Sequence, residues 1–87
     1  MAETTEERRR RLIHRSLYTG MRETDLLLGG FAKHYVPGFS DEQLDRYERL
    51  LMAPDPDIFD WATGRQPVPP AHDHDVMRLL KNFKAMP

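Results

Sequence analysis

Apolar residues along this chain recur at the spacing of an α-helix, and this periodicity constrains the fold more than any other feature. Two such sets occupy positions 27, 28, 31 and 35, with Thr24 on the same face, and positions 76, 79, 80 and 83. Intervals of this kind place side chains on one face of a helix. No stretch alternates cleanly between apolar and polar residues, so we predict no strands. The pattern predicts an all-α fold, a compact five-helix bundle.

Start and stop signals divide the chain into helical segments. Thr4–Glu7 and Ser40–Gln43 read as capping boxes, which open helices. Asp55 is a suitable N-cap before Pro56 at the first helical position, and Gly64 closes that short helix. We expect helices over about residues 4–18, 21–35, 40–52, 55–63 and 70–84.

The length of 87 residues and the lack of cysteine limit the function. One small core leaves no room for cofactor and substrate pockets of ordinary size, so we expect a protein that is not an enzyme. Without cysteine there is no disulfide, thiolate metal site or catalytic thiol. We expect a single helical domain over residues 1–87, with an ordered core of about 5–84.

The chain lacks long apolar runs. The longest spans Leu26–Leu28, far short of a membrane helix, so we expect no membrane insertion. Acidic residues close to the first methionine argue against a signal or transit peptide. We therefore expect a protein of the bacterial cytoplasm.

Charge is unevenly distributed although the net charge is only −1. Residues 1–22 hold six arginines and three acids, whereas residues 41–60 hold seven acids and two arginines. Two interpretations remain open: a dipolar docking surface, or the ordinary preference of helix ends for charges. Acids beside the Arg8–Arg11 run, and the acidic net charge, argue against binding of nucleic acid.

The remaining reactive side chains form no convincing site. His72 and His74 alternate with acids, but residues two apart on a helix point to different faces, so we expect no metal. Phe59 and Trp61 are interpreted as core residues that fasten a short helix, with an exposed partner contact as the alternative. No serine lies in the context of a nucleophile, and we predict no catalytic residue.

The corner between the first two predicted helices holds Thr19, Gly20, Met21, Arg22 and Glu23. Gly20 has no side chain, so a partner's backbone could approach it closely. Met21 offers an apolar contact, and Arg22 and Glu23 can make charge-assisted hydrogen bonds. The alternative is an ordinary turn that Thr19 caps, and the residues alone favour it.

Two segments nevertheless resemble a known family. Gly20–Glu23, followed by Asp25–Leu28, resembles the signature region of the succinate dehydrogenase assembly factors. Asp55–Trp61 resembles the second signature of that family, at the matching separation. The resemblance covers about residues 8–84 and implies a five-helix bundle, in agreement with the helical periodicity.

The resemblance also implies a function. Members of the family bind the flavoprotein subunit of succinate dehydrogenase, and often that of fumarate reductase, and promote covalent attachment of FAD to it. The resemblance implies that the bond-forming chemistry belongs to the flavoprotein, so this chain is expected to bind no cofactor itself. We also expect it to be a monomer when free. The alternative is an interaction module of toxin–antitoxin or regulatory type without a role in flavinylation.

The family's main motif, R-G-x-x-E, places its glycine at Gly20 and its glutamate at Glu23. Its leading arginine falls at Thr19, which supplies neither a cation nor a forked donor. Arg15 or Arg22 is the candidate to replace that cation. The predicted partner-binding residues are therefore Gly20, Glu23, Met21, Arg22, Thr19 and Arg15.

Overall fold

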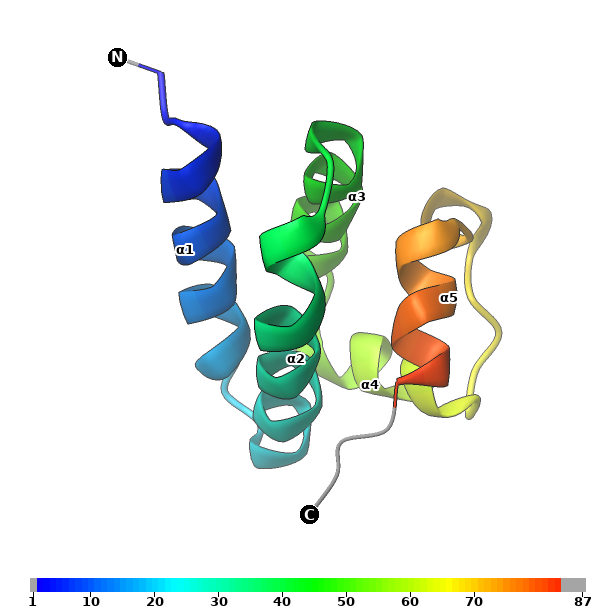
Figure 1. Ribbon diagram of the computed structural model, residues 1–87. Helices are drawn as coiled ribbons and strands as arrows, with labels where there is room; N and C mark the ends of the chain where they lie inside the picture. The colour runs from blue at the N-terminus through cyan, green and yellow to red at the C-terminus, as the bar shows by residue number, and fades with distance from the viewer. Residues whose placement is uncertain (1, 84–87) are drawn as a thin grey trace.

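The computed structural model describes residues 2–83 of the chain, and these form five α-helices and two short 3-10 helices (Figure 1). The α-helices are α1 (Thr5–Leu17), α2 (Arg22–Tyr35), α3 (Asp41–Leu51), α4 (Asp55–Thr63) and α5 (Asp75–Asn82). The 3-10 helices are η1 (Val36–Gly38) and η2 (Pro70–His72). The described residues contain no strand, so the predicted all-α bundle of five helices is confirmed.

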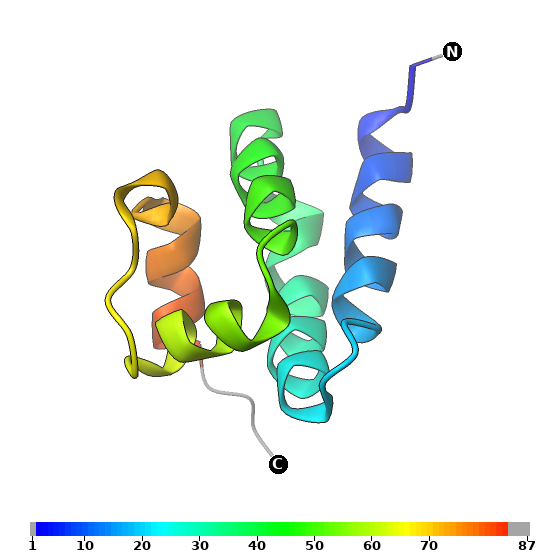
Figure 2. The ribbon, with the colours of Figure 1, turned by 180° about the vertical axis from the view of Figure 1, so that it is seen from behind.

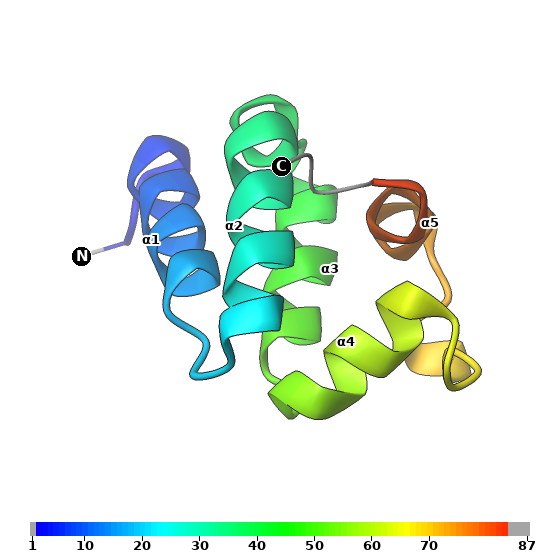
Figure 3. The ribbon, with the colours of Figure 1, turned by 90° about the horizontal axis from the view of Figure 1, so that it is seen from below.

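Helices α1, α2 and α3 run alongside one another, and α4 crosses the end of the bundle at which the α1–α2 loop lies (Figures 1 and 2). Seen from below, α4 leads away from the end of α3 towards α5 on the far side (Figure 3). The α1–α2 corner and α4 therefore share one end of the molecule. No helix within residues 2–83 is long and apolar enough to span a membrane.

The core draws fully buried side chains from all five helices. Phe31 of α2 occupies its centre, with ring centroids of Tyr35, Phe39, Tyr47 and Phe83 at 5.0 to 6.1 Å. Such clustered rings bury large apolar areas and fix their neighbours' orientation. The apolar periodicity therefore marks the faces on which these helices pack.

Of the starts of α1, α3, α4 and α5, those of α1 and α3 follow the sequence signals. The Thr4–Glu7 and Ser40–Gln43 capping boxes are both formed, as predicted. The prediction of Asp55 as an N-cap was wrong by one residue, because Pro54 is the N-cap of α4. The carbonyl of Pro54 accepts the N–H groups of Asp57 and Ile58 at 3.0 and 3.1 Å, so the helical bonding begins one residue earlier.

The predicted helix over residues 70–84 is also wrong, because η2 ends at His72 and α5 begins at Asp75. The His74 ring caps α5, its Nδ1 accepting the N–H of Met77 at 3.1 Å. The extended backbone of His74 interrupts the helix, and the bond satisfies a free N–H at the new helix start. Helix α5 ends at Asn82, and Lys84 lies outside the described residues.

Gly29 and Gly30 lie inside α2 at points where other elements approach closely. A Cβ at Gly29 would lie 2.7 Å from Leu17 Cδ2 at the end of α1. At Gly30, the nearest atom would be in the Phe83 ring, at 3.4 Å. Close packing therefore explains this pair of glycines, and the position of Gly29 lets α1 and α2 meet near their shared corner.

Ion pairs join the basic α1 to the acidic α3. Arg8 lies 2.6 Å from Asp45 Oδ1 and 3.0 Å from Glu48 Oε1. Arg11 lies 3.1 Å from Glu48 Oε2 and 2.8 Å from Glu3 Oε2. Part of the basic charge of the N-terminal region is thus neutralised by acids of the same molecule. Neither a docking surface nor the preference of helix ends for charges had included such pairing.

Candidate partner-binding surface

The corner between α1 and α2 is shaped by Gly20. Its φ of +110° lies in the range that side-chain-bearing residues rarely adopt. A Cβ at Gly20 would also lie 3.4 Å from Asp55 Oδ2, at the start of α4. The two segments that resemble the family signatures are therefore neighbours in space, although 35 positions separate Gly20 and Asp55.

Thr19 stabilises this corner through hydrogen bonds to the first turn of α2. Its backbone N–H and its hydroxyl both donate to Asp25 Oδ1, in the first turn of α2. The hydroxyl bond first, and then the backbone bond, hold the pKa of the Asp25 carboxyl below its usual 3.8. Thr19 is not the helix cap that the ordinary turn would use, because Met21 is the N-cap of α2 and makes no side-chain capping bond.

A surface hollow of about 460 Å³ lies between this corner and α4. We call it the α2–α4 hollow, and its lining residues are Met21, Glu23, Pro56, Phe59, Asp60 and Arg65. Apolar side chains and charges of both signs line it together, a mixture that suits a protein surface carrying both kinds of group. Of the residues predicted from the sequence, Met21 and Glu23 line the hollow and Gly20 adjoins α4 beside it.

Phe59 has a different role from the one predicted. Ile58 and Ala62 are the buried residues of α4. Trp61 packs against the core, and its ring centroid lies 5.2 Å from that of His72. Phe59 is only half-buried and lines the hollow, so the prediction that it belongs to the core was wrong. The reason is helical geometry: Phe59 follows Ile58 directly and so faces away from the buried stripe.

Arg65 was missed by the sequence analysis. It follows Gly64, which ends α4 with a φ of +80°. Its backbone N–H donates to Asp60 O at 2.9 Å, and its guanidinium carbon lies 5.7 Å from the centroid of the Phe59 ring. Only a weak sequence signal points to Arg65. It is a cation that directly follows a glycine, and that glycine turns the chain back over its own helix.

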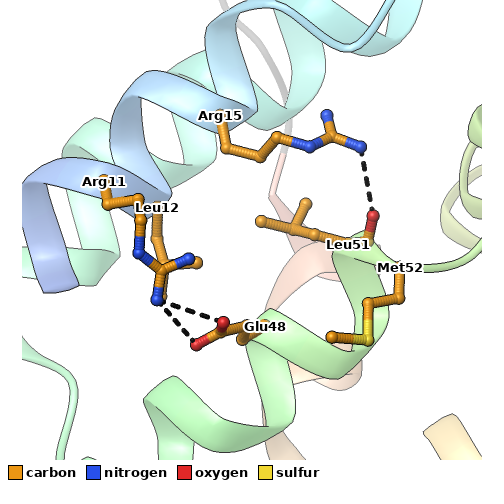
Figure 4. Close-up of a pocket in the computed structure, with 6 residues that line it drawn as sticks. All are labelled: Arg11, Leu12, Arg15, Glu48, Leu51 and Met52. Atoms are coloured by element: carbon orange, nitrogen blue, oxygen red, sulfur yellow. Dashed lines mark hydrogen bonds and ion pairs between the residues drawn. The ribbon is translucent and has the colours of Figure 1, made fainter.

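Arg15 lies at a different place, in a groove of about 270 Å³ between α1 and α3 (Figure 4). Its Nη2 donates to Leu51 O at 3.2 Å, close to the exposed Met52. Arg22 is exposed in the first turn of α2 and forms no ion pair with any residue from 2 to 83. Neither arginine lines the α2–α4 hollow.

The histidine–aspartate segment has structural roles. Burial lowers the pKa of the His74 imidazole, which caps α5. Asp75 accepts bonds from Gln43 and Arg46 of α3, at 3.2 and 3.0 Å. Within residues 2–83 no group of three or more histidine and acidic side chains is placed to hold a metal ion.

Comparison with known proteins identifies the family. A family model described as the flavinator of succinate dehydrogenase matches residues 10–84. The chain belongs to this family. The resemblance seen in the two signature segments is thereby confirmed.

Curated relatives of this flavinator family carry consistent names. Succinate dehydrogenase assembly factor 2-B, mitochondrial, of Drosophila yakuba is 46% identical over 81 residues, which are 91% of this chain and 52% of that protein. Succinate dehydrogenase assembly factor 2, mitochondrial, of Debaryomyces hansenii is 48% identical over 83 residues, 91% of this chain and 58% of that protein. The chain thus spans little more than half the length of these relatives.

These names correct one expectation. Both relatives are named as mitochondrial proteins, whereas the sequence analysis placed this chain in the bacterial cytoplasm. The names point to mitochondria rather than to that compartment, so the expectation was wrong. It rested on the acidic residues near the first methionine.

Proposed function

We propose that this protein is an assembly factor of succinate dehydrogenase that binds the flavoprotein subunit and promotes covalent attachment of FAD to it. The flavoprotein subunit of fumarate reductase is a second partner of the same kind. Membership of the flavinator family supports the proposal. The observation that carries it is the α2–α4 hollow, which joins the two signature segments in one exposed surface.

The proposed mechanism is a shift of population. Binding favours the flavoprotein conformation in which the flavin and its attachment residue are held together. The factor changes this equilibrium only as far as its affinities for the two conformations differ. In this proposal it is not an enzyme, it is a monomer when free, and it holds no FAD of its own.

The corner residues contribute in different ways. Gly20 and Thr19 define the shape, the first through its backbone angle and the second through Asp25. Glu23 offers an exposed carboxylate and Met21 a half-buried apolar surface within the hollow. Arg22 and Arg15 are placed for contacts outside it.

Loss of the gene provides the first test. In-gel fluorescence of covalent flavin on the flavoprotein subunit should fall when the gene is deleted and return when it is restored. Unchanged fluorescence, with the subunit at its normal level, would refute the proposal. Capture of a toxin or a cytoskeletal protein in place of the flavoprotein from a native lysate would favour the interaction-module alternative.

Restoration with variants tests the surface. Glu23→Gln removes one charge from the hollow and should restore less covalent flavin than the wild type. Glu42→Gln is the matched control, because Glu42 is an exposed acid in the first turn of α3 and does not line the hollow. Equal restoration by the two variants would remove Glu23 from the contact.

A further inference from the structure

Arg65 is positioned at the α2–α4 hollow by one bond of its backbone and by one contact of its guanidinium. Its carbon lies 5.7 Å from the Phe59 ring centroid, within the range of a cation–π interaction. The backbone beneath it is fixed by the bond from the Arg65 N–H to Asp60 O. An arginine positioned in this way loses less conformational freedom when it binds a ligand.

Arg65 is one of the arginines that form no ion pair within residues 2–83. Five other arginines form ion pairs in the described part of the chain: Arg8, Arg9, Arg11, Arg46 and Arg78. No carboxylate between residues 2 and 83 lies within 4.0 Å of the Arg65 guanidinium, although Asp60 and Glu23 line the same hollow. Arg65 is an exposed lining residue of the hollow, and its side-chain donors have no ionic partner among the described residues.

We propose that Arg65 binds a side-chain carboxylate of the partner flavoprotein and is a specificity-determining residue of the α2–α4 hollow. This inference rests on the proposed function. The planar guanidinium fork matches a carboxylate through two parallel hydrogen bonds. Met21 and Pro56 line the hollow beside it, so the acidic residue of the partner would be accompanied by apolar contacts.

The lining of the hollow suits a protein side chain better than a phosphate of the flavin, because apolar side chains lie beside Arg65. Glu23 and Asp60 repel any anion that approaches Arg65. The same two acids accept a basic residue of the partner, so the hollow suits a partner surface with an acid and a base side by side.

The experiment measures the dissociation constant between the purified full-length chain and the flavoprotein subunit, with the flavoprotein both free of FAD and loaded with it. Arg65→Gln should weaken binding about 10-fold or more in both forms, because the partner's carboxylate is left without its cation. Binding of this variant should also depend less on salt. Arg65→Lys keeps the charge but loses the fork, and should lie between Arg65→Gln and the wild type.

Arg49→Gln is the matched control, because Arg49 is an exposed arginine in the last turn of α3 that does not line the hollow. It should bind as the wild type does, and all variants should keep the wild-type melting temperature. Wild-type affinity of Arg65→Gln would overturn the inference and leave the proposed function intact. Failure of the wild-type chain to bind the flavoprotein would overturn both.

Two further outcomes decide the chemistry. A loss confined to the FAD-loaded flavoprotein would assign Arg65 to a flavin phosphate and overturn the carboxylate contact. Wild-type affinity of Arg65→Lys would overturn the forked geometry. Equal loss in the FAD-free and FAD-loaded forms, with Arg65→Lys intermediate, would support the contact as proposed.

Discussion

Replacing Gly29 with alanine should set two effects against each other where α2 packs on α1. Alanine is favoured over glycine inside a helix by about 1 kcal/mol. Its Cβ, however, would lie 2.7 Å from Leu17 Cδ2, whereas two carbon atoms pack best at about 3.5–4.0 Å. Overpacking of this kind costs about 1–3 kcal/mol. We expect Gly29→Ala to lower the free energy of unfolding by about 1 kcal/mol, as the difference between these effects.

The sign should reverse when Leu17 is shortened. In Leu17→Ala the obstructing methyl group is gone, and the remaining neighbour of the new Cβ is the Leu17 Cα at 3.9 Å, an ordinary contact. Only the gain in helix propensity then remains, so Gly29→Ala should raise the free energy of unfolding by about 1 kcal/mol in this background. The two backgrounds should differ by about 2 kcal/mol, within the range for residues in contact.

The assay is urea unfolding of the four proteins of this cycle, followed by far-ultraviolet circular dichroism. Gly38→Ala serves as a control, because a Cβ at Gly38 would meet nothing within 4 Å. Its effect should be the same with and without Leu17. If Gly29→Ala changes stability equally in both backgrounds, the close approach of α1 and α2 is not what requires glycine.

Three other changes test the interior and the corner. Thr24→Val should raise the free energy of unfolding by about 1 kcal/mol in urea unfolding, because the buried Thr24 hydroxyl has no hydrogen-bond partner among residues 2–83. Tyr47→Phe should lower it by about 1 kcal/mol, because it removes the buried bond of 2.6 Å between the Tyr47 and Ser16 hydroxyl groups. Asp25→Asn should melt at a lower temperature than the wild type at neutral pH, since Asp25 accepts both bonds from Thr19. A carboxyl whose pKa is lowered in the folded state stabilises that state above its unfolded pKa, so the melting difference should shrink as the pH falls below 3.8. A difference that is constant from about pH 6 to about pH 2 would refute the role of the Asp25 charge.

The arrangement of helices was largely predictable because its signals are local. The Ser40–Gln43 box satisfies the start of α3 through residues only three apart. The start of α5 was missed because a histidine seldom caps a helix, and the bond from Met77 to His74 Nδ1 depends on a ring orientation that no spacing rule conveys. The early start of α4 was missed because Pro54 supplies only a carbonyl.

Only the side of the α2–α4 hollow that the α1–α2 corner forms was predictable from the sequence. Gly20 and Glu23 were singled out as a corner and through the family resemblance. Arg65 and Phe59 complete the hollow from α4 and the turn after it, and their approach depends on tertiary packing that sequence spacing does not encode. The pairing of Arg8 with Glu48 was missed for the same reason, because the two are 40 positions apart and meet only once α1 lies on α3.

The ion pairs between α1 and α3 make the attachment of α1 to α3 sensitive to salt. Leu12 and Ser16 of α1 are fully buried, and partly exposed charges join α1 to α3. Ionic attachments of this kind weaken with salt, whereas the apolar packing of α1 on α2 does not. Amide hydrogens of α1 should therefore exchange with solvent faster than those of α2, and increasingly so as salt is added. Opening of α1 would release the Leu17 end of the corner between α1 and α2. Ionic strength would then change the rigidity of the α2–α4 hollow beside that corner.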